Sequence, residues 1–159
     1  MAYIIIGFVV IMAISPIFWM RPSPRQKQLE RLRAYAGKRG LDVSIRKLPQ
    51  KLRYRHDFDM MSCYSKYHPR GAKQQEVVRK KWFISLEKGF DWVSRPDLEY
   101  QQQLQNITDS LPDSCSYVEA EQLFVAVYWR EKGDSSTVDQ VAEVIEKIML
   151  IQSQKYREQ

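Results

Sequence analysis

Two histidines, two aspartates and a cysteine gather between residues 56 and 68, where they could carry metal or acid–base chemistry. His56 and His68 lie on either side of Cys63, and imidazole with thiolate is a ligand set that zinc favours. The spacings match no common zinc motif and a fourth ligand is missing, so a metal site is not predicted. Asp57 and Asp59 lie on the same side of an extended segment, where two carboxylates could hold a divalent cation or share a proton. Such pairs are common in solvated turns, and a solvated turn is the favoured interpretation.

The usual catalytic fingerprints are missing from the chain. It contains no Walker loop, GxGxxG, GxSxG or HExxH pattern, which are the motifs of many nucleotide, hydride and hydrolase sites. Cys63 and Cys115 belong to no CxxC pattern and are expected to be core thiols. The sequence therefore favours a protein that is not an enzyme and holds no metal or cofactor. A membrane-tethered enzyme, or a ligand or metal sensor, with a pocket around His56, Asp57, Asp59 and His68 is the alternative.

The first 20 residues, MAYIIIGFVVIMAISPIFWM, carry no charged side chain. A helix of this length spans roughly 30 Å, the thickness of a bilayer core. No Lys or Arg precedes the apolar stretch, and the bulky PIFWM follows it where a signal peptide would have a small-residue cleavage site. The pattern therefore predicts a permanent transmembrane helix at residues 1–20.

Cations follow this stretch directly. Residues 21–55 contain 12 Lys and Arg against 2 Asp and Glu, whereas residues 96–159 contain 5 against 12. The positive-inside rule then places the N-terminus outside and the remaining chain in the cytoplasm. Cations beside an anionic leaflet contribute about 1 kcal/mol each to membrane binding. The residues expected to contact lipid headgroups or an acidic partner are Trp19, Arg21, Arg25, Lys27, Arg31 and Arg33.

The same cations raise the alternative of RNA binding close to the membrane, with aromatic rings of RKKWF as a stacking surface. Trp82 and Phe83 are neighbours on a predicted strand and so face opposite ways, which leaves only one ring for such a surface. Burial of Trp82 is favoured, and the membrane accounts for the location of the charge. Nucleic acid is therefore a disfavoured partner.

Prolines at 22 and 24 interrupt the membrane helix, and Ser23 is a suitable cap for a second helix that ends at Gly37 or Gly40. This basic helix could lie on the membrane surface or pack on the domain, and packing is favoured. The predicted organisation is a transmembrane helix at 1–20, a basic elbow and helix at 21–40, a cytoplasmic domain at 41–154 and a tail at 155–159.

Residues 41–45 alternate apolar with polar, which is typical of a half-buried strand. Further strands are predicted in DMMSCYSKY, in VVRKKWFISL with FDWVS as a hairpin around Gly89, and in SYVEAEQLFVAVYW, where a break near Glu121 is either a turn or a bulge. Helices are predicted after Ser94, with Leu104, Ile107 and Leu111 on one stripe, and after Thr137, with Gln140 completing a capping box. The predicted fold class is α+β, with a mostly antiparallel sheet of four to six strands covered by two or three helices.

The span and the sequence MRPSPRQKQLERLR resemble, over residues 1–35, the small bacterial inner-membrane proteins of the YajC type, which are accessory to the Sec channel. Beyond residue 35 the glycine-rich strand segment of that family is absent and the chain has EKGD at 131–134 instead. The longer domain, with VAVYWREKG, is similar to a group of uncharacterised bacterial membrane proteins. The resemblance implies a single-pass inner-membrane protein with a periplasmic N-terminus. Its cytoplasmic interaction domain would serve a membrane complex such as the protein translocase.

Overall fold

The computed structural model describes residues 22–48, 60–68, 82–85, 91–92, 98–121 and 124–155, together with Tyr3, Gly7 and Met12. For 82–85 and 91–92 it describes the backbone alone. The chain divides into two units, Met1–Arg31 and Leu32–Gln159, and the boundary falls inside the helix α2 (Pro24–Lys38). The second unit is the α+β domain.

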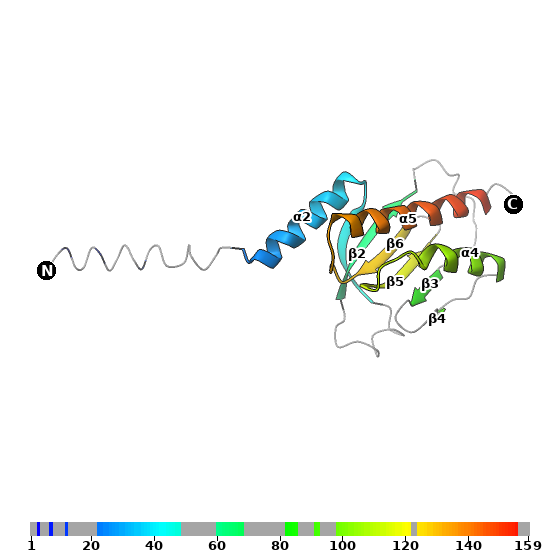
Figure 1. Ribbon diagram of the computed structural model, residues 1–159, viewed down its shortest axis with the longest axis horizontal. Coiled ribbons are helices and arrows are strands. Elements are labelled where there is room, and N and C mark those ends of the chain that lie inside the picture. The colour runs from blue at the N-terminus through cyan, green and yellow to red at the C-terminus, as the bar shows by residue number, and fades with distance from the viewer. Residues whose placement is uncertain are drawn as a thin grey trace. The chain divides into compact units, whose positions relative to one another are not determined.

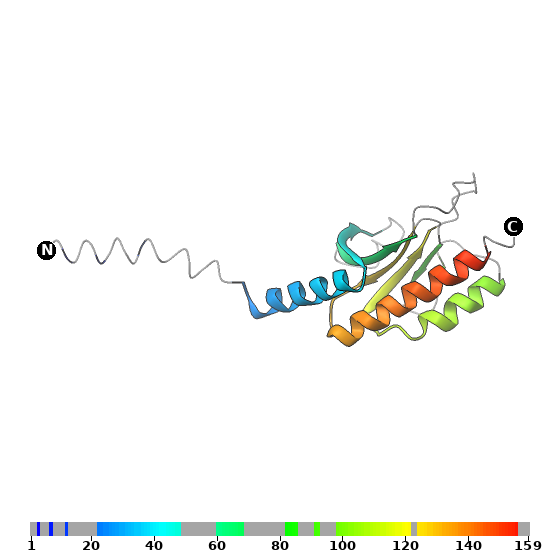
Figure 2. The ribbon, with the colours of Figure 1, turned by 90° about the horizontal axis from the view of Figure 1, so that it is seen from above.

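An antiparallel sheet forms the centre of this domain (Figure 1). The described residues contribute six strands to it, in the order β1-β2-β6-β5-β3-β4, and each strand is antiparallel to its neighbours. The helices α4 and α5 lie side by side on one face of the sheet (Figure 2). The α+β prediction, with its antiparallel sheet and three helices among the described residues, is confirmed. The bounds are β1 Asp42–Lys47, β2 Met60–Tyr67, β3 Trp82–Ser85, β4 Asp91–Trp92, α4 Leu98–Thr108, β5 Cys115–Ala120, β6 Phe124–Trp129 and α5 Ser135–Lys155.

The two central strands come from a segment rich in aromatic and β-branched residues. Every residue of β5 is buried, and so are the last five of β6, as expected for strands covered on both faces. The backbone N–H of Glu121 donates to the carbonyl oxygen of Phe124 at 2.8 Å. The break near Glu121 is therefore the connection of two paired strands rather than a bulge within one. The pairing of β3 with β4 likewise confirms the predicted hairpin, whose Gly89 lies outside the described residues.

Alternation along the strands separates two apolar clusters. The cluster under α4 and α5 includes Cys115 and Trp129, and the cluster on the opposite face includes Cys63. Burial raises the pKa of the Cys63 thiol to about 11 and that of Cys115 to about 12. Both side chains are buried and protonated at neutral pH, which makes them poor nucleophiles and poor metal ligands.

The helix ends follow local capping rules, with one correction. Ser23 caps α2 as predicted, because its Oγ accepts the N–H of Gln26 at 3.2 Å. The helix ends at Lys38, and Gly40 adopts the left-handed φ of 75° that favours glycine after a helix. The predicted Thr137 cap of α5 is wrong. Asp134 Oδ1 accepts the N–H of Ser136 and of Thr137, so the cap is Asp134 and α5 begins at Ser135, three residues earlier than predicted.

Within the parts of the chain that the structure describes, no helix has both the length and the apolar character needed to cross a membrane. The span predicted at residues 1–20 falls almost wholly outside the described residues and stays a prediction.

Candidate functional site

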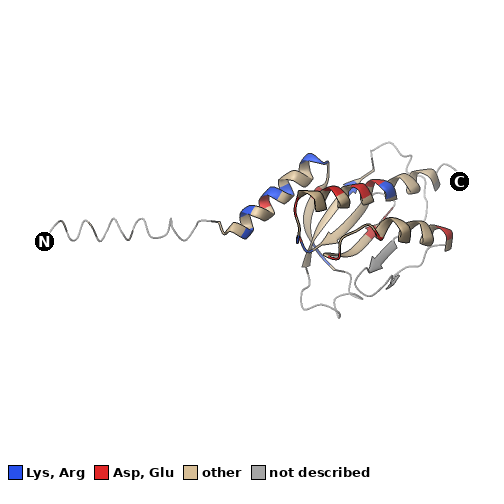
Figure 3. Cartoon of the chain, viewed as in Figure 1, with Lys and Arg blue, Asp and Glu red and all other residues tan. Residues whose placement is uncertain are grey.

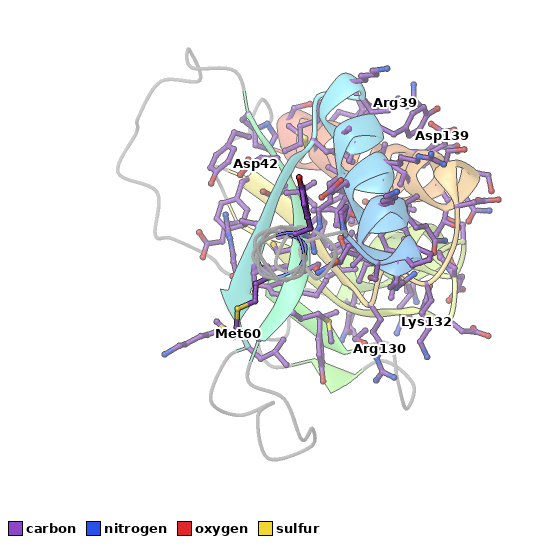
Figure 4. All side chains as sticks on the ribbon, turned by 90° about the vertical axis from the view of Figure 1, so that its left-hand side faces the viewer. Arg39, Asp42, Met60, Arg130, Lys132 and Asp139 are labelled. Carbon is purple, nitrogen blue, oxygen red and sulfur yellow. The ribbon has the colours of Figure 1, made fainter. Side chains whose placement is uncertain are left out.

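The second half of α2 packs on the domain. Leu32 and Ala36 are buried in the cluster under α4 and α5, with Ala36 at 0% exposure. The hydroxyl of Tyr35 lies 3.1 Å from both carboxylate oxygens of Asp139 on α5, and Arg39 Nε lies 2.8 Å from the same carboxylate. Figure 4 shows Arg39 and Asp139 side by side at the surface. From Leu32 onward the basic helix therefore rests on the domain, as favoured from the sequence.

The first cation of this packed segment forms an ion pair with a buried carboxylate. Arg33 binds Glu131 through two parallel hydrogen bonds, from Nε at 2.7 Å and from Nη2 at 2.8 Å. Ser62 Oγ donates to the same carboxylate at 2.8 Å and the Tyr64 hydroxyl donates at 3.0 Å. Glu131 retains 4% exposure. Four hydrogen bonds from three side chains thus satisfy one buried charge, which is the condition under which such a charge is tolerated.

The fold assembles this site from three elements. Ser62 lies opposite Trp129 in the β2–β6 register, so it stands beside the point where β6 ends. Tyr64 comes two residues later on the same face, and its ring packs edge-on against Trp129 with 5.1 Å between centroids. Glu131 follows β6 in the left-handed conformation, with φ of 54°, which is uncommon for a residue other than glycine. This uncommon backbone conformation therefore occurs at the residue whose carboxylate binds Arg33.

The electrostatics keep both partners charged. Burial alone would raise the pKa of Glu131, but the hydrogen bonds from Arg33, Ser62 and Tyr64 outweigh it and the pKa lies below its ordinary value. The hydrogen bond to Glu131 also raises the pKa of Arg33. Burial, followed by the charge of Glu131, raises the pKa of the Tyr64 phenol. No group in this set titrates near pH 7, so the site suits permanent attachment of α2 rather than proton transfer.

Acid should release this attachment. A depressed pKa means that Glu131 stabilises the fold fully above its unfolded-state pKa of about 4.3, and that this stabilisation is lost as the pH falls through the lower folded-state pKa. The difference in free energy of unfolding between the wild type and Glu131→Gln should therefore be constant from pH 7 to about 5 and shrink below about pH 4. Urea unfolding at a series of pH values measures it. A difference that stays constant down to pH 3 would contradict the ionised assignment of Glu131.

The predicted contact residues divide between the two units. Trp19 and Arg21 lie outside the described residues. Arg25, Lys27 and Arg31 are exposed on the first part of α2, and Figure 3 shows the cations spaced along this helix. Arg33 is 37% exposed in its side chain and is bound to Glu131. Contact of these residues with headgroups or an acidic partner stays a prediction.

Of the four residues expected to line the alternative enzyme or sensor pocket, the structure describes only His68. Its Nε2 lies 3.0 Å from Gln152 Oε1 on α5, and the Gln152 amide nitrogen donates to the carbonyl oxygen of Glu121 at 3.3 Å. His56, Asp57 and Asp59 lie outside the described residues. Among the described residues no group of three or more His, Cys, Asp or Glu side chains could hold a metal ion.

Glu119 and Glu131, the buried carboxylates of the described part of the chain, are not among the residues singled out from the sequence. Glu131 stands in REKGD, which has the composition of a solvated loop, and the residue that binds it is 98 positions away. Glu119 lies in β5 and accepts a hydrogen bond from the Tyr128 hydroxyl at 2.7 Å, on the face opposite α4 and α5. A sequence signal existed for Glu119 alone, because a carboxylate inside an aromatic and β-branched strand needs a buried donor.

Comparisons of the chain with protein-family models, with curated proteins and with solved structures found no match. Its function is therefore inferred from its own residues and geometry.

Proposed function

We propose that this chain is a single-pass membrane protein whose α+β domain is a protein-interaction module held close to the cytoplasmic face of the membrane. The observation that carries the proposal is the packing of Leu32 and Ala36 in the domain core, a short distance along the chain from the charge-free residues 1–20. The first residue fixed to the domain thus follows the predicted span by only 11 residues, 21–31.

Chain geometry sets the reach of this tether. Residues 24–31 belong to α2 and rise about 1.5 Å each, and residues 21–23 cover at most about 3.6 Å each, so the 11 residues bridge at most roughly 25 Å between the span and the domain. A domain on such a tether meets membrane-bound partners at a high effective concentration, and modest affinity is then sufficient for binding. The exposed cations Arg25, Lys27 and Arg31 lie within the tether, where anionic headgroups attract them.

An accessory role in a membrane complex fits these features better than catalysis. Among the described residues the buried carboxylate of Glu131 binds Arg33 of α2, and so serves the internal attachment of this helix. The resemblance of residues 1–35 to YajC-type proteins makes the protein translocase of the bacterial inner membrane the first complex to test.

Membrane attachment is tested by fractionation of cells that express the full chain or a variant lacking residues 1–20. We expect the full chain in the membrane fraction, resistant to alkaline carbonate, and the shortened chain in the soluble fraction. The triple variant Arg25→Glu, Lys27→Glu, Arg31→Glu should lose about 3 kcal/mol of headgroup attraction and insert with mixed orientation. Lys132→Glu, at an exposed position of the domain, controls for a change in net charge.

Orientation is read from added cysteines, because Cys63 and Cys115 are buried. An impermeant maleimide should label Ala2→Cys in cells whose outer membrane alone is opened. It should label Ser136→Cys, an exposed position of α5, only after the inner membrane is opened as well. Carbonate extraction of the full chain, or labelling of position 136 from outside, would refute the proposed topology.

A further inference from the structure

The two edges of the sheet differ in a way that bears on self-association. The edge strand β4 has 2 residues, and a very short edge strand is a common protection against pairing with another chain. The other edge strand, β1, has 6 residues, contains neither proline nor glycine, and pairs with β2 over six consecutive residue pairs without a bulge. Within the described part of the chain, β1 has a strand neighbour on one side only. It therefore offers a regular edge to which another strand could add.

Charged side chains on an edge strand usually discourage such pairing. In β1, however, the charges complement one another when the strand meets its own copy in antiparallel orientation. A twofold axis perpendicular to the sheet keeps each face continuous, so residues of the same parity must lie opposite one another. An axis through Ser44 places Asp42 opposite Arg46 of the partner subunit. Axes through Val43 or Ile45 bring no opposite charges together.

The same register matches the apolar side chains. Ile45 is 59% exposed, and it would lie opposite the half-buried Val43 of the second copy. Opposite-charge and β-branched cross-strand pairs both stabilise antiparallel sheets. Arg46 is already fixed on its face by hydrogen bonds to Ser44 Oγ at 3.2 Å and to the Tyr67 hydroxyl at 3.1 Å. Asp42 stands exposed at the start of the strand (Figure 4).

We propose that two copies of this chain associate through their β1 strands, antiparallel about Ser44, and so form one continuous sheet. The contact involves about five residues from each copy and is smaller than the roughly 1,200 Å² of a stable interface. Confinement of both copies to one membrane raises their effective concentration. The fraction of chains that are paired in the cell therefore rests on the proposed membrane attachment. The register of the pairing does not.

Cysteine cross-linking of the full chain in membranes tests the register. Opposed residues of an antiparallel pair have Cα atoms about 4.5–5.5 Å apart, within the range of a disulfide. Under mild oxidation Ser44→Cys should form a disulfide-linked dimer. In the same register the two copies of Lys47→Cys lie about 20 Å apart, so this matched control should stay monomeric. Equal cross-linking at 44 and 47, or none at 44, would overturn the proposal.

Charge exchange provides the second test, in the Ser44→Cys background. Asp42→Arg alone and Arg46→Asp alone each place like charges opposite one another and should lower the dimer yield several-fold. The double variant should restore the yield, although, like Arg46→Asp alone, it lacks the hydrogen bond from Arg46 to the Tyr67 hydroxyl. No restoration would overturn the proposal. Shielding of the thiol introduced at position 44 from maleimide without any cross-link would overturn it too, because another occupant would then hold the edge.

The failure of self-pairing can be told from the failure of membrane attachment. If fractionation places the full chain in the soluble fraction, the same cysteine variants are oxidised at high concentration in solution, where the ratio of cross-linking at 44 to that at 47 still reports the register. If the chain is in the membrane and the ratio is one, the self-pairing proposal alone is wrong.

Discussion

Replacement of Glu131 with alanine should lower the free energy of unfolding by about 2–4 kcal/mol. Removal of one partner from a buried ion pair costs roughly 3–5 kcal/mol, because the other charge is left without compensation. Arg33 is 37% exposed, and solvent screening reduces that figure. Ser62 and Tyr64 lose an acceptor as well. Urea unfolding followed by circular dichroism measures the change.

Glu143→Ala is the matched control. Glu143 pairs with Lys147 on the exposed surface of α5, where such pairs contribute at most about 0.5 kcal/mol. Combining Arg33→Leu with Glu131→Ala should cost about 1–3 kcal/mol less than the sum of the two single changes, since neither charge is then left alone. Equal effects of Glu131→Ala and Glu143→Ala would contradict the attachment of α2 through Glu131.

Leu104→Ala should lower the free energy of unfolding by about 2–5 kcal/mol. Leu104 is the centre of the buried stripe of α4, at 0% exposure, and truncation of a buried leucine loses its transfer free energy and leaves a cavity. Leu98, on the same helix, is 77% exposed. Leu98→Ala should therefore change the stability by less than about 0.5 kcal/mol. Similar effects at the two positions would contradict the packing of α4 on the sheet.

Elements with a local signal were predictable from the sequence. Ser23 before Pro24, a glycine at 37 or 40, and the alternation from residue 41 predict α2 and β1 to within a few residues, because capping and periodicity involve neighbours in the chain. The predicted start of α5 is three residues late, because Asp134 and Thr137 are both residue types that cap helices. Only the observed hydrogen bonds show that Asp134 is the cap and Thr137 its reciprocal partner.

The carboxylate site could not be predicted in the same way. Arg33 and Glu131 are brought together by the strand order, which places the end of β6 beside the start of β2 and under the second half of α2. Periodicity reveals which face of an element is apolar, but not which elements become neighbours. Arg33 is consequently among the cations predicted to contact headgroups or an acidic partner, and nothing in the sequence indicates that its guanidinium binds a carboxylate of the domain.

Purification of the full chain from native membranes in mild detergent, beside the variant lacking residues 1–20, tests most directly the claim that this is a membrane-held interaction module. Partners are identified and quantified by mass spectrometry, with the same membranes lacking the protein as background. We expect a stoichiometric membrane complex with the full chain, translocase subunits being the first candidates, and its loss on deletion of residues 1–20. Recovery of no partner with either form, or of the same partners with both, would contradict it.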